Sequence, residues 1–339
     1  MTNPARSNSS WMRWVSYWLT LQPKVVKAAR FIANAIVSQR AVQALQRDVR
    51  TEGRTTPMTR KRVRLEGIHP DAYTTKDDKA ALEALKRVPL LPPVLRKFHE
   101  LGLDRWYYVR NMGMSVRVGP AQMPSLYRIF REACSILDVP EPELYVSNHP
   151  FTNAFAGGVE RPYITLRSSI LDLLDEDELF HLFGHELAHI KSGHLLYTMV
   201  GWLLLPLLRA LGRRLPLLGD VAAISLLMAF YNWMRLSEIS CDRAGLLVSQ
   251  DLEASLRANL HLTAGESRFK EELSLDAFRQ QARTYQEAPG MDNLGKVILF
   301  FTESWRFTHP MPVHRTQMLE KWYNSGAFDR ILEGDYPKS

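Results

Sequence analysis

The segment His185-Glu186-Leu-Ala-His189 is the part of this chain best suited to chemistry. On a helix, two histidines four residues apart project from the same face, so their imidazoles can bind one metal ion. Glu186 lies beside them, where its carboxylate can take a proton from a metal-bound water. The pattern predicts one zinc ion per chain that activates water. Two structural histidines on an amphipathic helix are the alternative, which the glutamate between them disfavours.

A catalytic zinc site needs a third protein ligand and an open fourth position. Glu238 and Asp242 are the candidates, because they lie four residues apart on one face of a second predicted helix. We expect Glu238 to be the third ligand and Asp242 to accept the free ring N–H of a ligand histidine, which fixes the tautomer of that ring. Solvated carboxylates that pair with Arg235 and Arg243 are the alternative that this segment leaves open.

The helix that carries the histidine pair has recognisable ends. Acidic residues at 175–178 suit the positive end of a helix dipole, and apolar residues then recur with helical spacing. The helix should end near Ser192 and Gly193. His181 and His194 do not have the metal spacing, so we interpret them as a helix-face histidine and a helix-end histidine near the dipole.

Together with three further segments, these residues resemble the M48 peptidase family, the gluzincins that include the HtpX proteases and the CAAX prenyl endopeptidases. The resemblance covers about residues 110 to 323. Acidic residues 177–178 resemble the lead-in to the family's metal helix. Asn153-Ala154-Phe155-Ala-Gly-Gly resembles its edge strand, which would pair with an extended substrate. His309-Pro with Arg315 resembles its C-terminal element, which approaches the active site.

The resemblance implies an α+β fold with a zincin-like, gluzincin domain that is predominantly helical and has a small sheet. It also implies a zinc metalloendopeptidase. A donor must also stabilise the tetrahedral oxyanion. His309 and Arg315 are the implied candidates, and His314 is a competing imidazole. The implied residues are His185, His189 and Glu238 as zinc ligands, Glu186 as general base, His309 or Arg315 as oxyanion donor, and Asn153, Ala154 and Phe155 for substrate.

We expect the substrate to be extended or misfolded polypeptide, in protein quality control at or near a membrane. The rival is a non-catalytic zinc protein or chaperone-like binder that holds unfolded chains through the edge at residues 153–159. Glu186 argues against that rival, because a scaffold has no use for a general base. A CAAX prenyl peptidase is disfavoured, because it would need a membrane chamber of many helices. No basic and aromatic pattern indicates a nucleic-acid partner, and the sequence does not indicate an oligomeric state.

Composition favours a reducing compartment. The chain has 339 residues, 46% hydrophobic and 23% charged, which suits one large domain with an appended region. Cys134 and Cys241 are the only cysteines, so a disulfide framework is excluded. We expect both to be buried, although Cys241 could also act as a redox switch. The expected location is cytoplasmic, with contact to the cytoplasmic face of a membrane as an open option.

The basic character of the chain is concentrated at its start. Residues 1–62 hold twelve Lys or Arg against two acidic residues, while the whole chain has a net charge of +7. Trp11, Trp14 and Trp18 recur with helical spacing there. A helix in a membrane interface, an organelle-type transit peptide, and a helix packed on the catalytic domain all fit this pattern. We therefore divide the chain into a basic N-terminal region and linker, 1–64, and a metallopeptidase domain, 65–335.

Two apolar stretches, 195–208 and 215–234, make residues 195–235 an apolar helical insertion. The first is shorter than the roughly 20 residues that a spanning helix needs, so buried or interface-dipping helices are favoured over a membrane hairpin. The remaining pattern predicts strands and helices in succession, as in an α+β domain. Helices are expected at 77–88, 94–101 and 125–137, and strands at 114–118 and 144–147.

Overall fold

The computed structural model describes residues 61–87, 102–149, 151–198, 218–265, 267–287 and 311–338. The chain divides into two compact units, Met1–Arg60 and Lys61–Ser339, and every described residue belongs to the second. The expectations for residues 1–60, for the helix at 94–101, for most of the first apolar stretch and for His309 lie outside the described residues. Arg62 and Val63, which we expected in the linker, bind Ser249 and Gln250 of the second unit.

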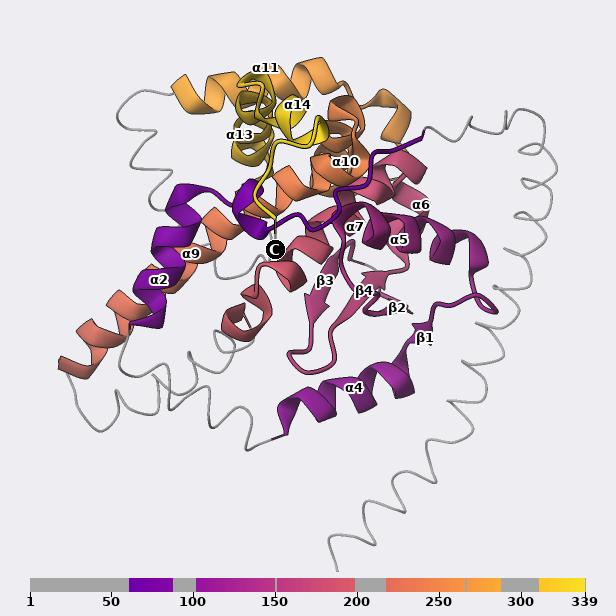
Figure 1. The fold of residues 1–339 in the computed structure, drawn as a ribbon, viewed down its shortest axis with the longest axis horizontal. Helices are drawn as coiled ribbons and strands as arrows, with labels where there is room; N and C mark the ends of the chain where they lie inside the picture. Colours follow the sequence, from indigo (N-terminus) through magenta and orange to yellow (C-terminus); the bar gives the residue numbers. More distant parts are fainter. Residues whose placement is uncertain are drawn as a thin grey trace, which may run out of the picture. The chain divides into compact units, whose positions relative to one another are not determined.

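A four-stranded mixed sheet lies within this unit (Figure 1). Its two central strands are parallel, and each outer strand is antiparallel to its neighbour. The central strands consist largely of buried apolar and aromatic residues, as strands covered on both faces do. The spatial order is β1 (Val116–Arg117), β2 (Glu143–Ser147), β4 (Tyr163–Arg167) and β3 (Ala154–Gly157). The segment expected to form an edge strand therefore does so, as β3.

Helix α5 (Pro124–Leu137) carries an apolar stripe against the core. Its buried residues recur at helical spacing, which is why this segment forms an amphipathic helix. Phe130 packs on Phe183 of the neighbouring helix α7, with ring centroids 5.3 Å apart. Cys134 is buried in the same stripe, as expected.

Helix α7 (Glu176–Lys191) is the expected metal helix. Asp175 and Glu178 form a capping box at its start: the Asp175 carboxylate accepts from the Glu178 N–H at 2.9 Å, and the Glu178 carboxylate accepts from the Asp175 N–H at 3.0 Å. The helix ends at Ser192, where Gly193 adopts a φ of 69° and reverses the chain. Both predicted ends are confirmed.

Helix α9 (Leu218–Ser249) is longer than expected. It runs without a break for 32 residues, so the second apolar stretch and the Glu238 segment are parts of one helix. It crosses α7 at two glycines. A Cβ on Gly184 would lie 2.7 Å from the Val248 Cβ, and a Cβ on Gly245 would lie 2.6 Å from the His181 Nδ1. Larger side chains there would push the two helices apart.

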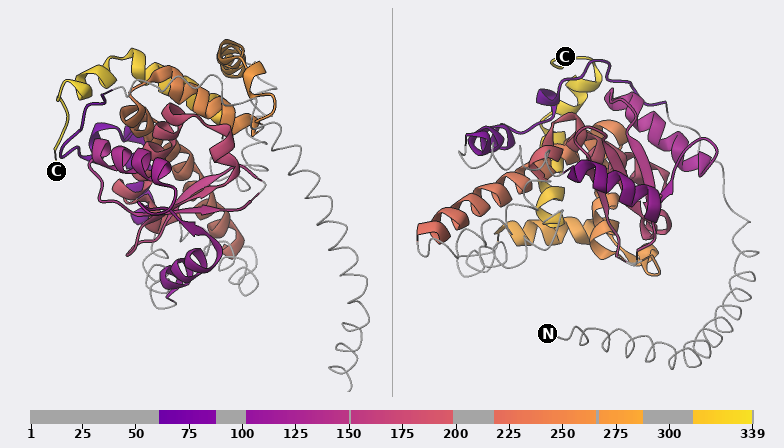
Figure 2. Two further views of the ribbon diagram at one scale, coloured as in Figure 1. Left: turned by 90° about the vertical axis from the view of Figure 1, so that its right-hand side faces the viewer. Right: turned by 90° about the horizontal axis from the view of Figure 1, so that it is seen from below.

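The other helices pack around the sheet and helices α5, α7 and α9. Helix α2 lies along α9, and α4 lies at the opposite end of the unit from α11, α13 and α14 (Figures 1 and 2). Helix α4 was not predicted, and Met114, expected to begin a strand, is its last residue. These elements are η1 (Pro70–Ala72), α2 (Lys76–Lys86), α4 (Leu103–Met114), α6 (Ser169–Leu173), α10 (Leu252–Ala264), η2 (Lys270–Glu272), α11 (Leu275–Glu287), α13 (Pro312–Asn324) and α14 (Ala327–Leu332).

The fold is mostly helical with one small mixed sheet, which agrees with the expected α+β class. Among the described residues, none of the helices combines the length and apolar character that crossing a bilayer requires.

Candidate metal centre and active site

Three side chains from α7 and α9 converge at the crossing of the two helices. His185 and His189 lie one turn apart on α7, and Glu238 approaches them from α9. The His185 Nε2 lies 3.3 Å from one Glu238 carboxylate oxygen, and the His189 Nε2 lies 3.4 Å from the other. All three residues are buried. The structure thus brings together the three residues that the sequence predicted as metal ligands.

The spacing of these atoms fits a tetrahedral metal ion. With metal–ligand bonds of about 2.1 Å, the corners of a tetrahedron lie about 3.4 Å apart, which matches both observed distances. Two imidazoles and one carboxylate also form a known ligand set for catalytic zinc, with a fourth position left for water. The donor set and both histidine–glutamate distances therefore fit such an ion.

Asp242 orients the first histidine, one turn after Glu238 on α9. Its Oδ1 lies 2.9 Å from the His185 Nδ1. When Nδ1–H donates to this carboxylate, the Nε2 lone pair faces Glu238 and is available to a metal. Although burial acts to lower the pKa of His185, the nearby charge of Glu238 and the contact with Asp242 hold it at about 9. The position thus attracts positive charge, whether a proton or a metal cation.

Arg315, from α13, joins the same cluster. Its Nε donates to the Asp242 Oδ2 at 2.7 Å, and its Nη2 donates to Oδ1. Its Nη1 lies 3.3 Å from Glu238. Burial acts to raise the pKa of Asp242, but the charge and hydrogen bonds of Arg315 hold it well below its usual value. Every nitrogen of the guanidinium group therefore lies near a carboxylate of the site.

Glu186 follows His185 on α7 and is almost fully buried. Its role as the general base stays a prediction. His314, the competing imidazole, is half-buried one residue before Arg315, and both burial and the charge of Arg235 lower its pKa. The third candidate for the oxyanion, His309, lies outside the described residues.

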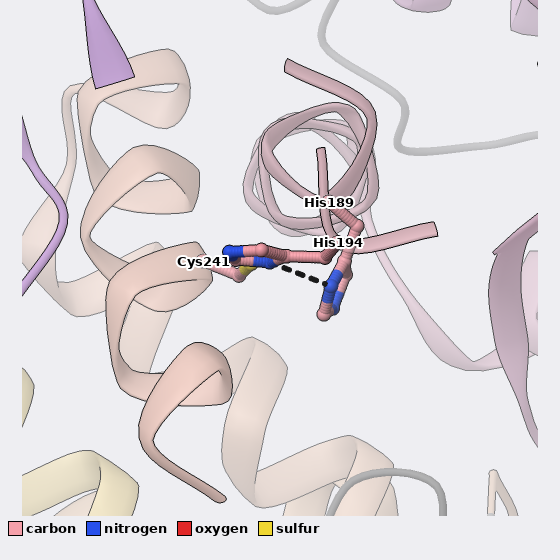
Figure 3. Close-up of side chains that lie close together, drawn as sticks. All are labelled: His189, His194 and Cys241. Carbon is pink, nitrogen blue, oxygen red and sulfur yellow. Dashed lines mark hydrogen bonds between the residues drawn. The ribbon is translucent and has the colours of Figure 1, made fainter. Parts of the chain in front are cut away.

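His194 lies just past the end of α7, as expected, but its contacts were not predicted. After the turn at Gly193 its ring lies in the interior, where it is buried beside His189. The two Nδ1 atoms lie 3.3 Å apart, and the Cys241 Sγ lies 3.7 Å from the His194 Nδ1 (Figure 3). Burial lowers the pKa of His194 to about 3, so this ring is neutral at physiological pH. The glycine at 193 signals a turn after α7, but the contacts of His194 depend on long-range packing.

The proposed substrate segment lies at one edge of the sheet, because β3 is its outermost strand. Ala154 and Phe155 belong to β3, which packs against α7, and Asn153 precedes them. The Asn153 C=O accepts from the Arg167 N–H at 2.9 Å. Because hydrogen-bonded pairs alternate along an antiparallel ladder, the backbone groups of Ala154 and Ala156 point to the outer edge of β3.

Comparison with known proteins identifies the family of this chain. The sequence profile of Peptidase family M48 matches residues 120–323. The plastoglobule-localized metallopeptidase 48, chloroplastic, of Arabidopsis thaliana is 32% identical over 234 residues, which cover 68% of this chain and 66% of that protein. A protease HtpX homolog of Kineococcus radiotolerans is 36% identical over 119 residues, which cover 32% of this chain and 40% of that protein.

A protease HtpX homolog of Burkholderia multivorans is 25% identical over 264 residues, or 68% of this chain and 87% of the relative. The chain thus spans slightly under two thirds of the Arabidopsis protein and less than half of the Kineococcus protein. No solved structure gives a significant match. The profile match covers more than half of the sequence and includes the three candidate metal ligands. The chain belongs to peptidase family M48.

Proposed function

We propose that this chain is a zinc-dependent metalloendopeptidase that hydrolyses peptide bonds in extended or misfolded polypeptides. The observation that carries the proposal is the placement of His185, His189 and Glu238 at tetrahedral spacing, with Glu186 buried beside them. The family relationship supports the same activity. We assign it to a zincin-like domain formed by residues 65–335.

Zinc, when bound, would polarise the scissile carbonyl and make a water molecule nucleophilic. His185, His189 and Glu238 would hold it. Glu186 takes the proton of the attacking water and delivers it to the leaving amine, as a general base and then a general acid. The near-complete burial of Glu186 shields its carboxylate from bulk water, as proton transfer within a closed site requires.

We propose that the substrate adds a strand to β3. The outward backbone groups of Ala156 would pair with an extended peptide, while Asn153, Ala154 and Phe155 border the path. Because β3 packs against α7, a peptide bound at this edge would run past the metal helix. Strand addition selects extended chain over folded protein, which supports misfolded polypeptide as the substrate class.

The contacts of Arg315 favour a role different from the one the resemblance implied. Its nitrogens face Asp242 and Glu238, so we propose that it neutralises these carboxylates and fixes their positions. Stabilisation of the oxyanion is then assigned to His309, with His314 as the competing imidazole. For the basic region 1–64 we propose contact with a membrane surface, and for the enzyme a place on the cytoplasmic face.

The test compares the wild type with Glu186→Gln on a permanently unfolded substrate, such as a reduced and alkylated protein. Zinc content is determined on both proteins. We expect Glu186→Gln to retain zinc and lose at least about 100-fold in cleavage rate, because it removes the general base without removing a ligand. Glu176→Gln is the matched control, since Glu176 is a more exposed residue in the first turn of the same helix.

Two outcomes would contradict the proposal. Undiminished cleavage by Glu186→Gln would remove Glu186 from the mechanism. If neither protein cleaved the substrate although both held zinc and bound it, the chain would be the non-catalytic binder of unfolded polypeptide described above.

A further inference from the structure

We propose that His194 and Asp78 form a relay that positions the metal ligand His189 and strengthens metal binding, an inference that rests on the proposed function. In this arrangement His189 donates to His194, and His194 in turn faces the Asp78 carboxylate. Neither His194 nor Asp78 would touch the metal or the substrate. Both would be positioning residues.

The first step follows from the two nitrogens of His189. Its Nε2 faces Glu238 and would bind the metal, so its Nδ1 must carry the proton. A ligand imidazole almost always donates this second N–H to an acceptor, which fixes the ring and raises its basicity. The His194 Nδ1 lies 3.3 Å away and takes that place. Two N–H groups cannot face each other, so the His194 Nδ1 must be the acceptor.

The second step fixes the proton of His194. If its Nδ1 accepts, its proton lies on Nε2, which faces the Asp78 Oδ2 at 3.7 Å. This distance is longer than a hydrogen bond, but a buried carboxylate opposite the N–H still favours that tautomer electrostatically. The Cys241 thiol also lies near the His194 Nδ1, at 3.7 Å, but an S–H is a weaker donor than the N–H of an imidazole.

Asp78 is itself held in place by two helices. The Ser240 Oγ of α9 donates to the Asp78 Oδ2 at 2.6 Å, and the Thr75 N–H donates to the same Ser240 oxygen at 3.0 Å. Thr75 caps α2 by accepting from the Asp78 N–H. The relay thus links the first turn of α2, which belongs to none of the metal-binding elements, to a ligand on α7.

The relay makes the environments of the two ligand histidines comparable. His185 donates directly to a carboxylate, that of Asp242. His189 reaches its carboxylate through one intervening ring. A histidine that merely filled the core would not need an acceptor nitrogen directed at a metal ligand.

The test measures zinc affinity of the full-length protein by competition with a chelator. We expect His194→Leu, which removes the acceptor, to raise the zinc dissociation constant by about 10- to 100-fold. His194→Asn supplies a carbonyl acceptor and should recover most of this loss. The absorption spectrum of the Co²⁺-loaded protein should shift in the Leu variant and return toward that of the wild type in the Asn variant.

A double-mutant cycle tests the order of the relay. Asp78→Asn should weaken zinc binding in the wild type and have no further effect beside His194→Leu, because Asp78 acts through His194. His261→Leu is the matched control. His261 is also buried and lies 3.0 Å from a carboxylate, that of Glu178 near the start of α7, so its loss should lower stability without changing zinc affinity.

Several results would overturn the relay. The first is unchanged zinc affinity in a folded His194→Leu variant. The second is an equal loss of zinc affinity in His194→Asn and His194→Leu. The third is that the losses caused by Asp78→Asn and His194→Leu add up in the double mutant.

Two zinc ions per wild-type chain, falling to one in Cys241→Ala, would instead make His189, His194 and Cys241 ligands of a second metal. If His194→Leu fails to fold, the zinc affinities of His194→Asn and Asp78→Asn still test the relay. Tight zinc binding without cleavage would contradict the proposed function and leave the relay standing, whereas no zinc binding would contradict both.

Discussion

Arg315 forms a buried ion pair with Asp242 through two of its nitrogens. The arginine lies on α13 and the aspartate on α9, 73 residues apart in sequence. Since Asp242 also contacts the Nδ1 of the proposed metal ligand His185, the pair connects the C-terminal helices to the candidate metal site. The position of that ligand therefore depends on a helix that supplies none of the described ligands.

Replacement of Arg315 by Met should destabilise the metal-free protein by about 3–5 kcal/mol, because it leaves buried carboxylates without their counter-charge. Urea unfolding with and without zinc would measure the loss. Arg330→Met, at an exposed position of α14, is the control and should change stability by less than about 0.5 kcal/mol. A loss below about 1 kcal/mol for Arg315→Met would mean that the pair does not compensate buried charge.

Gly184→Ala should separate α7 from α9. The added Cβ would lie 2.7 Å from the Val248 Cβ and 2.9 Å from the Ala244 carbonyl oxygen, and backbone cannot move aside as a flexible side chain can. We expect a loss of about 1–3 kcal/mol and weaker zinc binding, because His185 is the next residue. Thermal unfolding would measure the loss of stability, and competition with a chelator would measure the zinc affinity.

Gly113→Ala is the control for that substitution. Gly113 lies in α4, and a Cβ there meets nothing within 4 Å. It should leave zinc affinity unchanged and stabilise the helix by up to about 1 kcal/mol. If Gly184→Ala behaved in the same way, the close contact would not control the spacing of the ligands.

Ala156→Pro should weaken substrate binding. Proline removes the N–H that points to the outer edge of β3 and is tolerated on edge strands, so folding should survive. We expect KM for an extended peptide to rise at constant zinc content, and Ala156→Ser, which keeps the N–H, to resemble the wild type. If KM of Ala156→Pro equalled that of the wild type, the substrate would not bind at the edge of β3.

Acid should loosen the start of α7 through Glu178. Burial acts to raise the pKa of this carboxyl, but His261, the Asp175 N–H and Lys270 outweigh burial and lower it. A lowered folded-state pKa means that its stabilising contribution is complete above the unfolded value of about 4.3 and is lost as the pH falls through the folded value.

Urea midpoints measured from about pH 6 downward would record that loss. Glu178→Gln should be less stable than the wild type at neutral pH, and its midpoint should depend less on pH below about 4.3. Parallel pH dependence in the two proteins would contradict the role given to Glu178.

The parts of the site that follow helical spacing could be predicted, and those that depend on long-range packing could not. His185, His189, Glu238 and Asp242 lie on two helices in pairs four residues apart, so local geometry sufficed. Asp78 lies more than a hundred residues before His185 and Glu238, and no periodicity relates it to them. Helix α4 escaped prediction because its apolar residues do not form one buried stripe; Trp106 and Val109 are exposed.

The contact of α7 and α9 at Gly184 and Gly245 also bears on how this chain can diverge. The three candidate ligands lie on these two helices, and both glycines allow the helices to approach closely. We therefore expect Gly184 and Gly245 to be replaced only rarely, because any side chain there would separate the helices that carry the ligands.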